Sequence, residues 1–241
     1  RPAAGALAKV QADLAPQARG LKVFDCYRPA RAVAHFVRWA RAADNASLNQ
    51  ALESITVGDL KRHVLYLADD TFEGREAGSR GGRVAGGYLA RELQKAGLTG
   101  GANQGYFQDF DGNSRNILGV WEGSDPELKH EVIVLGAHYD HVGYGTASNS
   151  FGPIGRIHNG ADDNASGISG LLEIVEAIVR LEPRPRRTIL FALWDGEEKG
   201  LLGSKHWVAN PTIPLDRVRL MLNMDMIGRL RDNKIEMGGS R

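Results

Sequence analysis

Short apolar runs alternate with amphipathic stretches along the second half of the chain. The runs are typical of strands buried on both faces of a sheet, and the stretches repeat at the spacing of a helix. The expected strands cover 116–121, 131–136, 188–194 and 220–224, with another beginning at 234–237, and the expected helices cover 165–181 and 200–208. Alternation of the two elements predicts an α/β fold, a mixed sheet flanked by helices.

The first half of the chain is less regular. A polar stretch at 44–50 indicates a junction, and Thr56 is the expected N-cap of a new helix, with Asp59 three residues on. A glycine-rich loop over 72–82 precedes a helix over 83–96 that ends at Gly97. Before the junction, the pattern predicts a short α/β appendage, with helices over 3–14 and 30–43 and a strand over 21–25.

Composition narrows the class of protein. The net charge is +1, so no large basic surface for nucleic acid is expected, and no apolar run is long enough to span a membrane. The single cysteine, Cys26, cannot form an internal disulfide, and no signal peptide is visible. Neither charge nor pattern indicates an oligomeric state.

Four polar clusters follow apolar runs. They are 136–140 (GAHYD), 159–167 (NGADDNASG), 195–198 (DGEE) and 223–228 (NMDMIG). Open α/β sheets place their sites beyond the carboxyl ends of the strands, so the clusters are expected to converge. Together they offer one imidazole and several carboxylates, which are ligands suited to a catalytic zinc.

Each cluster also has a structural interpretation. A lone His138 at a strand end is more often structural, but Asp140 lies two residues on and is placed to orient its imidazole. Asp162, Asp163 and Asn164 suit helix capping, although three polar residues in a row exceed what one cap needs. His141 is interpreted as part of the loop.

The two remaining clusters carry acids in different settings. Glu197 and Glu198 are adjacent and point in different directions, so one can bind a metal while the other acts as a base toward water. Asp225 lies within a largely apolar stretch, where a buried carboxylate is costly unless it binds a cation.

Taken together, the motifs HYD, NGADDNASG, GEEKGLLGS and NMDMIG resemble the M28 family of zinc peptidases over about 54–241. The resemblance implies a phosphorylase/hydrolase-like fold and an aminopeptidase that uses two zinc ions on a peptide substrate. His138 and Asp225 would bind one ion, Glu198 the other, and Asp163 would bridge them. Glu197 would be the general base.

The resemblance implies three further features of this chain. The peptide bond after Asp163 is often cis in the family, and Asp163 is matched rather than Asp162 by its spacing to Gly167. The family's last ligand is a later His, but no His follows Asp225 here. The domain over 56–241 is therefore expected to lack its carboxyl-terminal part and one ligand, and the full-length protein is expected to be exported.

Three other functions stay open at this point. The same fold hosts glutaminyl cyclases, which are acyltransferases with one zinc, and a carboxypeptidase is also compatible with the motifs. The chain is also compatible with an inactive, truncated metal-binding domain.

Residues 1–43 resemble a different family. The stretch 20–33, with Tyr27-Arg28-Pro29, is similar to D-alanyl-D-alanine dipeptidases of the VanX type, in which that Arg stabilises the transition state. That family's zinc motifs do not follow here, so Arg28 is expected to have no catalytic role. The predicted organisation is thus a dipeptidase-like fragment (1–43), a junction (44–55) and an M28-like domain (56–241).

Overall fold

The computed structural model describes residues 46–150 and 152–228. Residues Ala46–Gly228 form one compact unit. The elements predicted over 1–43 and 234–237, and the resemblance of the first 43 residues to a dipeptidase, lie outside the described residues.

The unit is built on a mixed six-stranded sheet in the order β1-β3-β5-β4-β6, with β2 also paired to β3. Neighbours β4, β5 and β6 are parallel, whereas β3 runs antiparallel to β5. The strands are β1 (Thr99–Gly100), β2 (Phe107–Phe110), β3 (Ser114–Trp121), β4 (Val132–His138), β5 (Thr188–Trp194) and β6 (Val218–Asn223). The parallel strands therefore end at the same edge of the sheet.

Strand β5 shows how the sheet creates two cores. All seven of its residues are buried, and successive side chains point to opposite faces. Phe191 and Leu193 join the core under one face, whereas Leu190 and Ala192 join the core under the other. A continuous apolar run is the sequence pattern that this two-sided burial requires.

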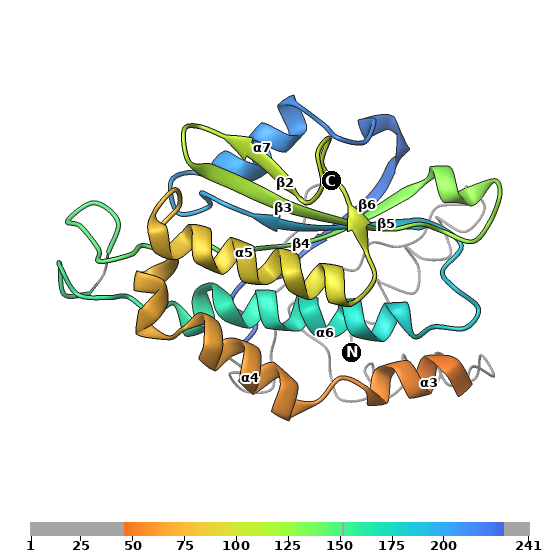
Figure 1. Cartoon of the computed structure of the whole chain (residues 1–241), viewed down its shortest axis with the longest axis horizontal. Coiled ribbons are helices and arrows are strands. Elements are labelled where there is room, and N and C mark those ends of the chain that lie inside the picture. Colours follow the sequence, from red (N-terminus) through yellow and green to blue (C-terminus); the bar gives the residue numbers. More distant parts are fainter. Residues whose placement is uncertain (1–45, 151, 229–241) are drawn as a thin grey trace, which may run out of the picture. The chain divides into compact units, whose positions relative to one another are not determined.

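Helices cover both faces of the sheet. Figure 1 shows α3 to α6 on one side and α7 on the other, and the core on the α7 side includes Trp207. The helices are α3 (Ala46–Glu53), α4 (Val57–Leu67), α5 (Arg80–Lys95), α6 (Gly167–Val179) and α7 (Leu202–Ala209). Short helical turns are η2 (Asp70–Arg75), η3 (Leu128–His130), η4 (Ala161–Ser166) and η5 (Leu215–Arg217). The α/β prediction with a mixed sheet is confirmed.

Three details differ from the sequence-based expectation. The polar stretch predicted as a junction contains α3, whose Ala51 is buried. Helix α5 begins at Arg80 because Ser79 accepts a hydrogen bond from the Gly82 amide, so the glycine-rich stretch is partly helical. The stretch after Gly97, for which no strand was expected, contributes β1.

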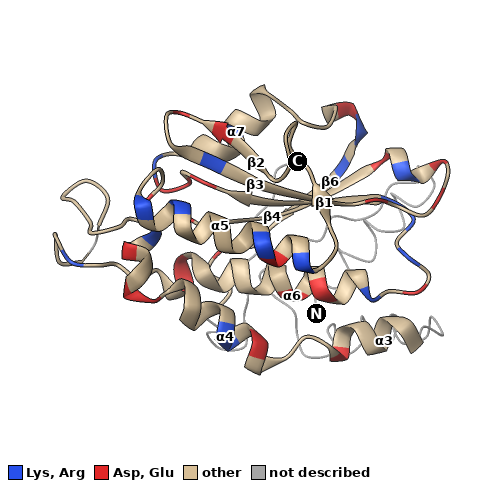
Figure 2. Cartoon of the chain, viewed as in Figure 1, with Lys and Arg blue, Asp and Glu red and all other residues tan. Residues whose placement is uncertain are grey.

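The described helices include none long and apolar enough to cross a membrane. Figure 2 shows basic and acidic residues interspersed over the helices and strand ends.

Candidate metal centre

The parallel strands bring the polar clusters together at one edge. His138 is the last residue of β4 and lies beside Trp194, the last residue of β5. The Met224 amide, just beyond β6, donates to the Gly136 carbonyl and continues the ladder toward Asp225. The ladder thus places the residues that follow the three strands at the same end of the sheet.

His138 is the centre of the first group of ligand atoms. Its Nε2 lies 3.2 Å from Asp163 Oδ1 and 3.3 Å from Asp225 Oδ1. His138 is only 1% exposed, whereas the Asp225 side chain is 46% exposed. The sequence-based argument that Asp225 is buried was therefore wrong. Asp225 follows β6, which is the outermost strand of the sheet formed by the described residues, and exposure alternates along that strand.

A second group forms around Glu198. His141 Nδ1 lies 2.6 Å from Glu198 Oε1, and a ligand atom of Asp163 is within 4.8 Å of both. Asp163 is therefore common to the two groups. His141 had been interpreted as loop structure, although its position just after the HYD motif is a signal that could have identified it.

Asp140 organises the turn that carries the two glutamates. Its buried carboxylate accepts hydrogen bonds from the main-chain amides of Glu197 (3.0 Å) and Glu198 (3.3 Å). Its Oδ1 lies 3.6 Å from His138 Nδ1, and that nitrogen is closer to the Asp140 carbonyl, at 3.2 Å. Asp140 thus links the end of β4 to the turn after β5.

The turn that presents Asp163 is irregular. The Asp163–Asn164 peptide bond is cis, and Gly160 has a φ of 58°, which favours glycine. Buried Asn164 donates to the Met224 carbonyl and accepts from the Met226 amide. This side chain therefore ties the turn before α6 to the segment that carries Asp225.

Arg75, which the sequence analysis did not identify as a site residue, holds together the loops that surround the centre. It is 1% exposed, and burial lowers the pKa of its guanidinium to about 10, against the opposing effect of Asp140, Asp163 and Glu198. Among the described residues, it donates hydrogen bonds to four main-chain oxygens, those of Leu67, Tyr139, Asn159 and Gly160. Its charge offsets the clustered acids, and its four bonds join the loops around them.

The charge balance indicates a site for a cation. Burial lowers the pKa of His138, but close contacts with the carboxylates of Asp140, Asp163 and Asp225 outweigh burial and raise that pKa to about 12. The His138 contact lowers the pKa of Asp163. Asp163 Oδ1 is buried and accepts no hydrogen bond from the described residues. These donors fit zinc, which takes imidazole and carboxylate ligands.

A cavity of about 260 Å³ opens beside this centre. Its wall includes His138, Asp225 and Glu197 together with the apolar side chains of Trp194 and Leu201. Burial raises the pKa of Glu197, and the charges of Glu198, Asp140 and Asp225 raise it further against the opposing effect of His138. A carboxylate of raised pKa therefore faces the same space as two candidate ligands.

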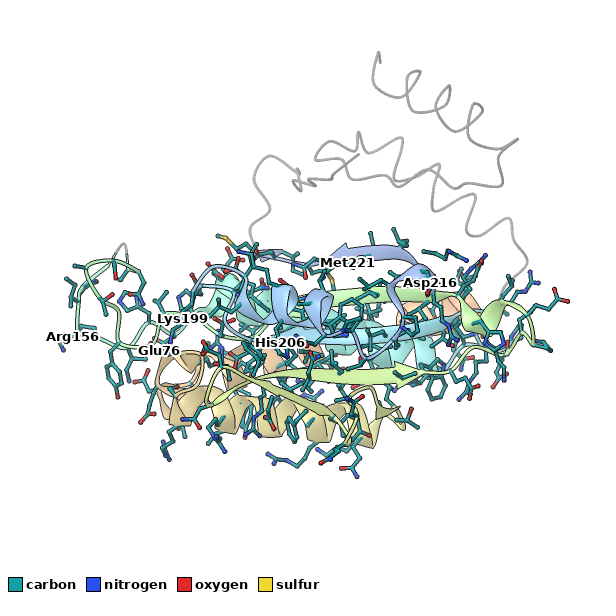
Figure 3. The ribbon with its side chains drawn as sticks, turned by 90° about the horizontal axis from the view of Figure 1, so that it is seen from above. Glu76, Arg156, Lys199, His206, Asp216 and Met221 are labelled. Atoms are coloured by element: carbon teal, nitrogen blue, oxygen red, sulfur yellow. The ribbon has the colours of Figure 1, made fainter. Side chains whose placement is uncertain are left out.

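Two other polar residues lie apart from the ligand groups. His206 on α7 stacks on Phe110, with ring centroids 5.1 Å apart, and its label in Figure 3 marks that helix. Lys199 lies 3.0 Å from Glu76, next to it in Figure 3. His206 therefore supplies no ligand to the two groups around Asp163.

The fold and the acid-imidazole cluster together define an α/β protein with a metal centre at the carboxyl edge of its sheet. Residues 116–240 match the protein-family model of Peptidase family M28. The chain belongs to this family.

Known relatives share part of this region. The chain is 30% identical to leupeptin-inactivating enzyme 1 of Streptomyces exfoliatus, over 72% of this chain and 36% of that protein. It is 34% identical to leucine aminopeptidase 1 of Trichophyton rubrum, over 62% of this chain and 40% of that protein. The match therefore spans well under half the length of either relative.

A solved structure supports the same fold. A Zn-dependent exopeptidase from Parabacteroides distasonis superposes with a TM-score of 0.57 at 25% identity, covering 72% of this chain and 62% of the other.

Proposed function

We propose that this chain carries the catalytic centre of a zinc-dependent aminopeptidase that uses two zinc ions. The observation that carries the proposal is the shared Asp163, which belongs to one ligand group with His138 and Asp225 and to another with His141 and Glu198. A carboxylate has two oxygens and is suited to bridge two ions. The names of the relatives, a leucine aminopeptidase and a Zn-dependent exopeptidase, support the same class.

Bound zinc acts as a Lewis acid toward a carbonyl oxygen and lowers the pKa of water. Glu197 is the residue of this chain that moves the proton: it accepts one from the attacking water and returns it to the leaving amine. Its raised pKa suits that exchange, since a base works best when its pKa approaches the working pH. The two bonds from Asp140 to the Glu197–Glu198 turn hold the base and the neighbouring ligand in fixed positions.

The lining of the cavity favours a free amino terminus over a free carboxylate. Besides the proposed ligand Asp225, the carboxylates of Asp195 and Glu197 contribute to the wall, and its described residues include no Lys or Arg. An ammonium group is attracted to such a surface and a carboxylate is repelled. The proposed substrate is therefore the amino-terminal end of a peptide.

Zinc content and turnover of aminoacyl-p-nitroanilides test this function in the parent chain and in Glu197→Gln. We expect the same zinc content in both proteins, including two ions at this centre, and a loss of turnover of roughly 10²–10⁴-fold in the variant, the range typical of a general base. Exposed Glu127 provides the control: Glu127→Gln is expected to match the parent. Full turnover in Glu197→Gln would exclude this residue as the base.

Blocked substrates separate the alternative reactions. An aminopeptidase loses its substrate when the amino group is acetylated, whereas a carboxypeptidase does not. Release of a pyroglutamyl product from an amino-terminal Gln would instead identify a cyclase. Zinc binding without any turnover would favour a metal-binding domain. Export of the full-length protein stays a prediction.

His141 is proposed as the imidazole ligand of the ion held by Glu198. His141→Gln is expected to lower the zinc content by about one ion per chain relative to the parent, measured by elemental analysis after dialysis. Unchanged zinc content would mean that His141 only hydrogen-bonds Glu198.

A further inference from the structure

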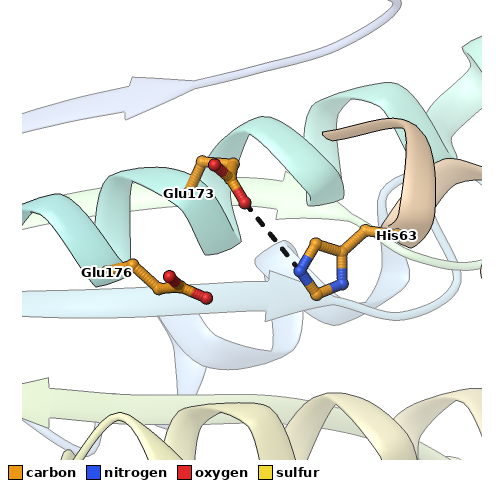
Figure 4. A group of neighbouring side chains, drawn as sticks. All are labelled: His63, Glu173 and Glu176. Carbon is orange, nitrogen blue, oxygen red and sulfur yellow. Dashed lines mark ion pairs between the residues drawn. The ribbon is translucent and has the colours of Figure 1, made fainter. Parts of the chain in front are cut away.

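A separate group of ligand atoms lies between two helices and shares no residue with the centre around Asp163. His63 comes from α4, and Glu173 and Glu176 come from α6. Figure 4 shows the imidazole facing the Glu173 carboxylate, with Glu176 one turn along the same helix. One ligand atom from each residue lies within 4.8 Å of the other two.

Glu173 has a buried carboxylate oxygen that accepts no hydrogen bond from the described residues. Its side chain is 1% exposed. One oxygen, Oε2, accepts a hydrogen bond from the Thr56 amide at 3.1 Å, but the buried Oε1 accepts none from the described residues. Oε1 instead points toward His63 Nε2, 3.9 Å away. An unsatisfied buried carboxylate oxygen is costly, and a cation between the two atoms would remove that cost.

His63 is held in an orientation that suits a ligand. It is 1% exposed, and its Nδ1 lies 2.5 Å from Tyr88 Oη. With a cation on Nε2, Nδ1 carries the proton and donates it to Tyr88, the outer hydrogen bond that metal-bound histidines commonly make. In this structure Arg62 Nη2 donates a hydrogen bond to Nε2 at 3.3 Å. The Arg62 side chain is 58% exposed and also pairs with Asp59 at 3.0 Å, so it has another partner when a cation takes its place at Nε2.

A path from solvent reaches this group. A cavity of about 330 Å³ is lined by His63 and Glu176 and also by Glu92. At its rim, Lys95 lies 2.7 Å from Glu92 and Arg180 lies 3.5 Å from Glu176. The Lys95 and Arg180 side chains are 71% and 53% exposed, so solvent screens both pairs and each contributes little.

We propose that His63, Glu173 and Glu176 bind a third divalent cation of the zinc class and that this ion joins α4 to α6. One imidazole and two carboxylates are a ligand set that zinc accepts, with a fourth position for water. Zinc with ligands at 2.0–2.1 Å separates them by about 3.3 Å, so the three side chains must close by roughly 1.5 Å at most. Glu176, whose side chain is 35% exposed, has the room to do so.

The test counts zinc ions in the parent chain, in Glu176→Gln and in the matched control Glu92→Gln, after dialysis against buffered zinc. Glu176→Gln keeps the shape of a partly exposed side chain and should fold. We expect it to hold one zinc fewer than the parent, while Glu92→Gln, which removes a charge from the same cavity, matches the parent. Equal zinc content in all three proteins would overturn the proposal.

A second measurement locates the ion without reference to activity. Crystals grown with zinc should show an anomalous peak at the zinc edge between His63 Nε2 and Glu173 Oε1. Absence of that peak, with peaks present around Asp163, would also overturn the proposal and leave the function proposed for the Asp163 centre standing.

Discussion

Arg75 shows how a single residue supports a site that it does not enter. Its guanidinium is buried because four main-chain oxygens from three separate segments accept its hydrogen bonds. The planar guanidinium of Arg has five N–H donors and can reach all four oxygens, whereas the ammonium of Lys offers only three donors from one atom. The nearby acids then keep the charge favourable despite its burial.

Replacing Arg75 with Met is therefore expected to lower the free energy of unfolding by about 3 kcal/mol or more, because several buried carbonyls lose their donor. Arg75→Lys should recover part of this loss. Urea denaturation measures both variants, with Arg83→Met on the exposed side of α5 as the control. A loss in Arg75→Met no larger than in the control would contradict this account.

At the scale of elements, α5 explains why so many glycines precede and enter a helix. A Cβ at Gly81 would lie 1.9 Å from the Phe72 carbonyl oxygen, because the first turn of α5 packs directly on η2. A Cβ at Gly87 meets nothing closer than 3.7 Å, the end of Arg91. Close packing on η2 therefore requires glycine at Gly81, whereas the space at Gly87 would admit a larger residue.

Alanine at these two positions should have opposite effects. Gly87→Ala is expected to raise stability by roughly 0.5–1 kcal/mol, since Ala favours the helix. Gly81→Ala is expected to lower it by more than that, since the main chain of η2 must shift. Thermal unfolding of the two variants decides the question, and stabilisation by Gly81→Ala would contradict the packing argument.

At the scale of the whole molecule, zinc and protons compete for the same atom. Without zinc, the carboxylates around His138 raise its pKa to about 12, so its imidazole carries a proton at neutral pH. Zinc binding at Nε2 must release that proton. The zinc affinity is therefore expected to rise with pH between about 6 and 8, by roughly tenfold per pH unit.

Calorimetric titration in buffers of different ionisation enthalpy measures the released proton. His206→Gln removes an imidazole outside the two ligand groups and should leave the release unchanged. An affinity independent of pH in this range would show that His138 does not bind the ion through Nε2.

Much of this molecule follows from its sequence. Burial of β5 on two faces requires a continuous apolar run, so the run over 188–194 indicates a central strand without knowledge of its neighbours. Parallel strands end at the same edge, so the clusters that contain His138, Glu198 and Asp225 could be expected to converge. The resemblance to the M28 family came from these same motifs.

Other properties depend on contacts that only the tertiary structure creates. The exposure of Asp225 reflects the position of β6 at the edge of the sheet that the described residues form, and the approach of His141 to Glu198 joins two loops 57 residues apart. The opposition of His63 and Glu173 depends on how α4 packs against α6. Local patterns in the sequence determine which residues form strands and helices, but distances between side chains on different elements arise only when those elements pack.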